Sequence, residues 1–174
     1  TVANNPAPII LSSGYLCEGK SITLSASKGF DTYLWSPNGE TKSDIIITSG
    51  GTYGVTVTDQ NGCTGQASID VEEIVLDINA DVTPYECGVG GSITITMGGN
   101  GSGMYQYQWL GPTVLDNVNQ ANGLMPGTYI ITVLDLVTGC VATETIVVPP
   151  GADAITASAI TTPETCAGLN NGSI

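Results

Sequence analysis

The chain has no histidine and no arginine, and its basic side chains are those of Lys20, Lys28 and Lys42. They stand against 16 aspartate and glutamate residues, so the formal net charge at pH 7 is −13. Such a chain offers no basic patch, which excludes binding to nucleic acid or to an anionic membrane surface through one. The absence of histidine also removes the commonest general base and the commonest metal ligand.

Long apolar runs and catalytic motifs are missing as well. No apolar run approaches the ~20 residues of a membrane-spanning helix, so we expect no direct insertion into a membrane. The sequence contains no G-x-S-x-G motif, and no pair of carboxylates stands out. We therefore expect no enzymatic activity and no bound cofactor. The segment at Thr1 lacks a signal-peptide pattern, and we expect the chain to be part of a longer, processed protein.

Turn-forming and β-branched residues are abundant instead. The chain has 23 glycines and 9 prolines, 41% of its residues are apolar, and only 11% are charged. The stretch TYGVTVTD (52–59) alternates apolar and polar residues with a period of two, as a half-buried strand does. Composition and alternation together predict an all-β protein with many turns.

The sequence repeats itself. GTYGVTVTDQNGC (51–63) aligns with GTYIITVLDLVTGC (127–140). Three further segments share a cysteine, a glycine and a Ser-Ile pair: CEGKSI (17–22), CGVGGSI (87–93) and CAGLNNGSI (166–174). This self-similarity predicts three units: a module over 1–73, a second over 74–149, and a linker with the first strands of a truncated third over 150–174.

Each complete module contains about six short strand-like runs separated by Asn-Gly, Gly-Gly or Pro-Gly turns. The predicted runs are 8–13, 21–27, 32–36, 43–49, 52–59 and 65–73 in the first module, and 73–82, 92–97, 105–110, 128–135 and 141–148 in the second. This spacing is typical of an Ig-like β-sandwich. We therefore predict tandem Ig-like modules in an elongated array.

Four aromatic residues have places in that prediction. Trp35 and Trp109 fall on the third strand of their modules, where a sandwich buries its central tryptophan. Tyr53 and Tyr129 fall near the start of the sixth strand, where a tyrosine corner forms. All four are predicted to belong to the structural core.

Tyr105, Tyr107 and Trp109 alternate along one run, so their side chains share one face of a strand. Such a strip can serve as a platform for sugar rings, or it can be the inner face of a sandwich strand. The matching pair Tyr33 and Trp35 in the first module favours the core interpretation, because both modules need that inner face.

At these residues the sequence resembles the repeat modules of gliding-motility adhesins on the surface of Bacteroidetes. TPYECGVGGSITITMGGNGSGMYQYQW (83–109) and GLMPGTYIITVLDLVTGC (123–140) resemble the SprB repeat. The first module, with CEGKSITLSASKG (17–29), YLWSPNGE (33–40) and GTYGVTVTDQNGC (51–63), resembles the Ig-like or PKD-like module of the same proteins. The ending DLVTGC departs from the usual D-x-N-G-C.

The resemblance implies a long, filamentous protein of the bacterial cell surface, exported by type IX secretion and serving cell adhesion. Its implied partners are neighbouring modules of the same chain and an extracellular surface or polysaccharide. Two alternatives stay open: a carbohydrate-binding accessory module of a secreted enzyme, and a spacer stiffened by calcium. For calcium, Asp59 and Asp135 are candidate ligands, although each also suits an ordinary turn.

The five cysteines lie in turn-rich contexts and form no C-x-x-C pair: Cys17, Cys63, Cys87, Cys140 and Cys166. Without histidine a zinc site is disfavoured, and disulfides in an oxidising, extracellular compartment are expected.

Two pairings of these cysteines are open. One closes each module, as Cys17–Cys63 and Cys87–Cys140. The other is a bridge between neighbouring modules, Cys17–Cys140, because the turn before the second strand and the turn after the sixth lie at opposite ends of a sandwich. Under either pairing Cys166 needs a partner elsewhere. Under the second pairing Cys63 and Cys87 need partners as well.

Overall fold

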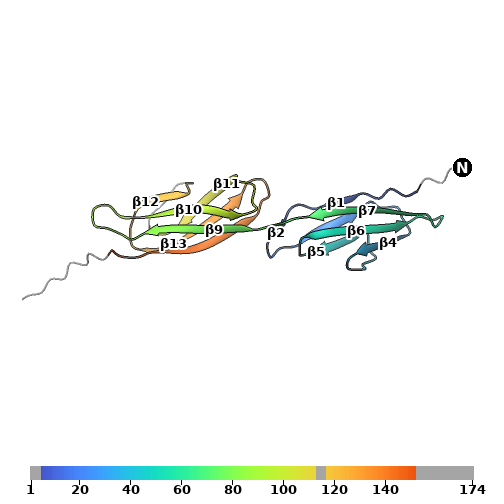
Figure 1. The fold of residues 1–174 in the computed structure, drawn as a ribbon, viewed down its shortest axis with the longest axis horizontal. Coiled ribbons are helices and arrows are strands. Elements are labelled where there is room, and N and C mark those ends of the chain that lie inside the picture. The colour runs from blue at the N-terminus through green and yellow to red at the C-terminus, as the bar shows by residue number, and fades with distance from the viewer. Residues whose placement is uncertain (1–4, 113–116, 152–174) are drawn as a thin grey trace, which may run out of the picture.

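A computed structural model describes residues 5–112 and 117–151 of the chain. Within these ranges the chain forms fourteen β-strands and no helix. The strands make two groups, each built around its own hydrophobic core. We call β1–β8 the first sandwich and β9–β14 the second sandwich. Figure 1 shows them one after the other along the longest axis of the molecule.

The first sandwich has two three-stranded antiparallel sheets and a short parallel pair. One sheet has the order β1-β3-β5 and the other the order β4-β6-β7. The bounds are β1 Ile10–Ser12, β2 Leu16–Cys17, β3 Ile22–Ala26, β4 Thr32–Ser36, β5 Asp44–Ile47, β6 Gly51–Thr58, β7 Thr64–Val71 and β8 Glu73–Ile74. The pair β2–β8 brings the end of this sandwich alongside its second strand.

The second sandwich repeats the plan with sheets of order β12-β10-β9 and β11-β13-β14. Its strands are β9 Leu76–Thr83, β10 Gly91–Gly99, β11 Tyr105–Leu110, β12 Gln120–Leu124, β13 Gly127–Asp135 and β14 Val141–Val148. The first and last of these, β9 and β14, lie next to each other across the two sheets.

Alternating apolar residues build both cores. In β6 the side chains of Tyr53, Val55 and Val57 are buried, while the residues between them are more exposed. In β13 the same alternation buries Tyr129, Ile131 and Val133. The period of two therefore places one face of each strand against the opposite sheet, as the sequence predicts.

The all-β prediction is confirmed, and most predicted runs coincide with strands. Two elements were not predicted: the two-residue β2 and the irregular β12. The predicted run 73–82 is wrong at its start, because Glu73 and Ile74 pair with β2 of the first sandwich and β9 begins at Leu76. The limits of the modules, 1–73 and 74–149, stay a prediction, and most of 150–174 lies outside the described residues.

The two tyrosines occupy matching places. The hydroxyl of Tyr53 donates to the carbonyl of Ser49 (2.8 Å), and that of Tyr129 donates to the carbonyl of Met125 (3.0 Å). Each bond runs to a carbonyl four residues upstream, as in a tyrosine corner.

The two tryptophans differ in burial. Trp35 is 1% exposed, whereas Trp109 is partly buried against the second core. Each indole N–H donates to a backbone carbonyl, that of Lys42 (2.8 Å) for Trp35 and that of Val118 (2.9 Å) for Trp109.

Candidate functional site: the junction between the sandwiches

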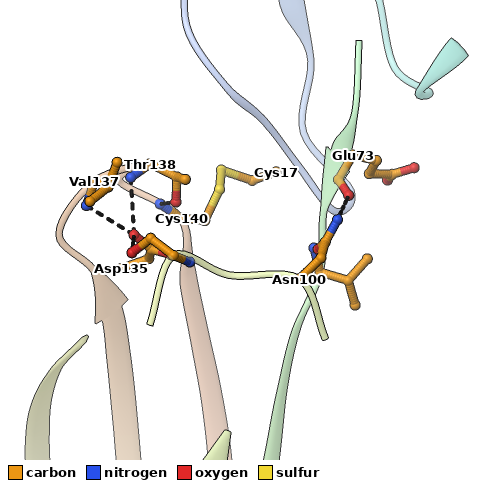
Figure 2. Close-up of a disulfide and its surroundings, with 9 residues drawn as sticks. Cys17, Glu73, Asn100, Asp135, Val137, Thr138 and Cys140 are labelled. Atoms are coloured by element: carbon orange, nitrogen blue, oxygen red, sulfur yellow. Dashed lines mark hydrogen bonds between the residues drawn. A yellow bond between two sulfur atoms is a disulfide. The ribbon is translucent and has the colours of Figure 1, made fainter. Parts of the chain in front are cut away.

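A disulfide joins the two sandwiches. Cys17 at the end of β2 is bonded to Cys140, which precedes β14, and their Cα atoms are 5.5 Å apart. The two residues are 123 positions apart in the sequence. Figure 2 shows this bond at the place where the first sandwich meets the second. The bridge is thus the one between neighbouring modules that the sequence left as one of two possibilities.

The alternative within each module, Cys17–Cys63 and Cys87–Cys140, is not what the structure contains. Cys63 lies in the turn between β6 and β7, whereas Cys17 pairs with Ile74, beyond the other end of β7. An eight-residue strand spans ~26 Å, far more than the ~6 Å that a disulfide allows between Cα atoms. The eight-residue β9 and β14 separate Cys87 from Cys140 in the same way.

Cys63 and Cys87 are free thiols in the structure. Cys63 is half-buried and Cys87 is exposed. Cys166 lies outside the described residues. The five predicted disulfide cysteines therefore divide into one bonded pair, two free thiols and one that the structure does not describe.

The turn that carries Cys140 is organised by Asp135. This side chain is 0% exposed, yet it has four hydrogen-bond donors around it. Its carboxylate accepts from the backbone N–H groups of Val137 (2.9 Å) and Thr138 (3.0 Å), and from both the N–H (2.6 Å) and the hydroxyl (2.7 Å) of Ser102. The buried charge is thereby satisfied without a basic partner.

These contacts set the pKa of the Asp135 carboxyl. Burial alone would raise this pKa, because it disfavours the charged form. The donors of Ser102, followed by the backbone N–H groups of Thr138 and Val137, outweigh burial and hold the pKa well below its ordinary value. Asp135 is therefore ionised at neutral pH, and its charge is stabilised by the donors of the turn and of Ser102.

Residues 98–103, the last two residues of β10 and the loop that follows them toward β11, also lie at the junction. We call this segment, GGNGSG, the glycine loop. Gly99 has a φ of +81°, and a Cβ atom there would clash with the carbonyl oxygen of Val75. A Cβ atom on Gly101 would clash with Leu76 and with the hydroxyl of Tyr105. Glycine at both positions lets the loop lie directly on the chain that connects the sandwiches.

Asn100, between these two glycines, binds that connecting chain through its side chain and its backbone. Its Oδ1 accepts from the N–H of Val75 (2.7 Å), and its Nδ2 donates to the carbonyl of Glu73 (2.9 Å) and to the carboxylate of Glu72 (2.7 Å). Its own N–H donates to the carbonyl of Val75 (3.1 Å). Figure 2 shows the amide pointing at the backbone of Glu73.

The junction is therefore one continuous network. Asn100 holds the connecting chain, Ser102 two residues later holds Asp135, and the Asp135 turn carries Cys140 to Cys17. A cleft of about 380 Å³ lies beside the disulfide, with Lys20 in its lining. Asn100 and Ser102 were not found from the sequence, although the glycine-rich segment around them was a signal of close backbone approach.

The predicted aromatic strip lies on β11. Tyr105, Tyr107 and Trp109 are all partly buried and pack against the second core. The rings of Tyr105 and Tyr107 meet edge to face at 6.5 Å, and burial raises the pKa of the Tyr107 phenol, with Tyr105 adding to the rise. The face of the strand opposite these rings carries Gln106 and Gln108.

The two aspartates considered as calcium ligands both organise turns. Oδ1 of Asp59 accepts from the backbone N–H groups of Asn61 and Cys63, both at 2.9 Å, while Asp135 has the contacts given above. Among the residues that the structure describes, no three histidine, cysteine, aspartate or glutamate side chains gather as metal ligands would.

The described ranges contain no long, apolar helix of the kind that crosses a membrane.

Comparison with known proteins gives a fold and no family. No family model matches the chain, and no curated protein matches it. Among solved structures, a 282-residue C-terminal fragment of intimin, in complex with the intimin-binding domain of its translocated receptor, is 18% identical, with a TM-score of 0.50. That match covers 81% of this chain and 63% of the intimin fragment.

Two further solved structures are similar at lower scores. Three N-terminal domains of the outer capsid protein Hoc of bacteriophage RB49 are 18% identical at a TM-score of 0.45, with 80% of this chain and 57% of that one covered. The ectodomain of mouse nectin-like molecule 4 is 14% identical at a TM-score of 0.37, with 86% and 66% covered. The chain thus spans less than two thirds of each of these three proteins, and the intimin match shows an Ig-like fold.

Proposed function

We propose that the chain is a stalk segment of a large, repetitive protein of the bacterial cell surface, in which Ig-like modules follow one another in an elongated array. The observation that carries this proposal is the junction, where Cys17–Cys140 and the Asn100 contacts fasten two sandwiches to each other. A binding domain or an enzyme needs a site, whereas a stalk needs joints that resist bending.

The details of the proposal come from the sequence resemblance. We propose modules over 1–73 and 74–149, a gliding-motility adhesin as the parent protein, and export by type IX secretion. An extracellular location agrees with the disulfide, since such bonds persist in oxidising compartments. The proposed partner is an extracellular surface, which many linked modules contact weakly, so that avidity comes from linkage.

Intimin offers a precedent for a protein partner. Its fragment with the Ig-like fold was solved together with a receptor domain. In a stalk, the domain that contacts the partner sits at the tip, and the modules below it set how far the tip extends. We propose no catalytic role for this chain.

Small-angle X-ray scattering on the full chain tests the stalk. The oxidised chain is expected to give one narrow distribution of interatomic distances with the maximum dimension of two sandwiches in line. The double variant C17S/C140S is expected to give a broader distribution, because the joint loses its covalent bond while each core remains. C63S/C87S is the matched control and is expected to scatter like the parent chain, since both thiols are free. Equal, broad distributions for all three proteins would contradict a stiff joint.

A further inference from the structure

The two free thiols lie at opposite ends of the pair of sandwiches. Cys63 is in the turn between β6 and β7, and Cys87 is in the turn between β9 and β10. In Figure 1 these turns are at the two outer ends, with the Cys17–Cys140 junction between them. Each sandwich contributes strands of eight residues, ~26 Å long, to the path that separates the two thiols, so they cannot bond within one chain.

Cys63 sits in the same kind of turn as Cys140. In each turn the aspartate N–H donates to the cysteine carbonyl, at 2.9 Å both for Asp59–Cys63 and for Asp135–Cys140. The glycine before each cysteine has a positive φ, +77° at Gly62 and +73° at Gly139, and donates its N–H to the aspartate carbonyl. The outer end of the first sandwich thus presents a cysteine after a turn that is closed by the same two backbone hydrogen bonds as the Cys140 turn and is one residue shorter.

Cys87, like Cys17, lies in a segment beside the chain that leaves its sandwich. At the inner end, β2 runs parallel to the departing β8, and the N–H of Glu18 donates to the carbonyl of Ile74 (2.9 Å). At the outer end, the N–H of Tyr85 donates to the carbonyl of Pro149 (3.0 Å). Gly151 then lies so close to Tyr85 that a Cβ atom would clash with its carbonyl oxygen. At the inner end and at the outer end alike, the chain that leaves the sandwich runs alongside the segment that carries the cysteine.

We propose that the outer end of the second sandwich, around Cys87, docks the Gly-Cys turn of another module of this kind and forms a disulfide with it. Cys63 offers such a turn to a preceding module. The occupant is a further module of the same type, because the observed junction joins one cysteine of each class and the chain displays one more of each. This inference rests on the proposed stalk, and it adds which ends of two successive modules meet and which cysteines bond them.

Bond formation needs an oxidant, here a small disulfide such as oxidised glutathione. The Cys87 thiolate attacks one sulfur of glutathione disulfide and releases one glutathione thiolate. The thiolate of the second module's cysteine then attacks the Cys87 sulfur of the mixed disulfide and releases the second glutathione. Two thiols lose their protons, one protein disulfide forms, and glutathione disulfide is reduced to two glutathione molecules.

The test uses the full chain with C166S, at high concentration in a buffer of reduced and oxidised glutathione. Peptides from an acid-directed protease, kept unreduced, report three bonds between copies: Cys63–Cys87, Cys63–Cys63 and Cys87–Cys87. The pairing ratio is the square of the Cys63–Cys87 yield divided by the product of the Cys63–Cys63 and Cys87–Cys87 yields. Random pairing at equilibrium gives a ratio of about four, whatever the reactivities of the two thiols. Docking is expected to raise the pairing ratio about tenfold or more.

The matched control is C63S/Q60C, which moves the thiol within the same turn, because Gln60 is exposed there. The bond between the relocated thiol and Cys87 is expected to fall to the random ratio. A random ratio for the parent chain would overturn the docking proposal. The scattering experiment on C17S/C140S is unaffected by that result, so the stalk and its mode of growth can fail separately.

Discussion

The side-chain amide of Asn100 binds the backbone on both sides of Ile74, through the N–H of Val75 at 2.7 Å and the carbonyl of Glu73 at 2.9 Å. Asn100 belongs to the second sandwich, whereas Glu73 and Ile74 pair with β2 of the first. One side chain therefore fixes the stretch of backbone at which a hinge between the sandwiches would have to turn. The disulfide limits how far the sandwiches separate, and Asn100 limits how they rotate.

We expect Asn100→Ala to loosen the joint with little effect on either core. Its hydrogen bonds are exposed, so each contributes at most about 0.5–1.5 kcal/mol. The measurement is NMR relaxation of the two tryptophan indole N–H groups, one per sandwich. With Cys17–Cys140 reduced in all proteins, the tumbling times of the two groups should be shorter and differ more in the variant than in the parent chain. Asn79→Ala, on the outer face of β9, is the control and should match the reduced parent chain.

Gly99→Ala and Gly103→Ala separate backbone strain from contact. Both glycines have a positive φ, +81° and +86°, so either substitution carries the strain of a left-handed residue, about 1–2 kcal/mol. Only at Gly99 would the added Cβ also clash with the carbonyl of Val75. We expect Gly99→Ala to lower the urea midpoint further than Gly103→Ala and to shift the amide resonance of Val75. Equal midpoints and an unmoved Val75 resonance would show that the loop does not press on the connecting chain.

Tyr129→Phe and Tyr53→Phe remove the hydroxyls of the two tyrosine corners. Each hydroxyl donates to a carbonyl, of Met125 and of Ser49, and each ring is buried. Because both substitutions keep the ring, the expected loss is about 0.5–1.5 kcal/mol of unfolding free energy in the substituted sandwich. Urea titration followed by the indole N–H signals of Trp35 and Trp109 assigns the loss to one sandwich. A loss in the unsubstituted sandwich of similar size would mean that the two unfold as a single cooperative unit.

The strands with regular alternation could be predicted from the sequence. The runs 105–110 and 141–148 have the bounds of β11 and β14, and in β11 burial alternates without interruption. β12 escaped because its buried residues, Ala121 and Leu124, are three positions apart. The register shift between Gly91 and Ser92 opposite them breaks the period of two on which the prediction depends.

The junction could be predicted only in part. Strand geometry made Cys17–Cys140 one of two possible bridges, since it places the turns of one sandwich at opposite ends. It could not choose, because the choice depends on how two sandwiches meet. Asn100 escaped altogether, because its partners lie 25 to 28 positions away in the sequence. Apart from the Glu72 carboxylate they are backbone groups, which leave no mark in the sequence.

Asp135→Asn is expected to destabilise the second sandwich at neutral pH and to matter less as the pH falls. The amide places two N–H donors where the carboxylate accepts four hydrogen bonds, which leaves buried donors of Ser102, Val137 or Thr138 unpaired at a cost of about 1–3 kcal/mol. The folded-state pKa of Asp135 lies below its unfolded value, so the parent chain's advantage is fully present above the unfolded pKa of about 3.9. It is lost as the pH falls below that value toward the folded pKa.

Urea midpoints of the Trp109 signal between pH 7 and pH 2.5 measure this advantage. The gap between the parent chain and Asp135→Asn should be constant down to about pH 5 and narrow below about pH 4. Asp59→Asn is the control, because the equivalent carboxylate of the first sandwich is only half-buried and accepts fewer hydrogen bonds. Its effect should be confined to the Trp35 signal. A gap for Asp135→Asn that stays constant to pH 2.5 would mean that the carboxylate charge contributes nothing, and that the turn beside Cys140 depends on shape alone.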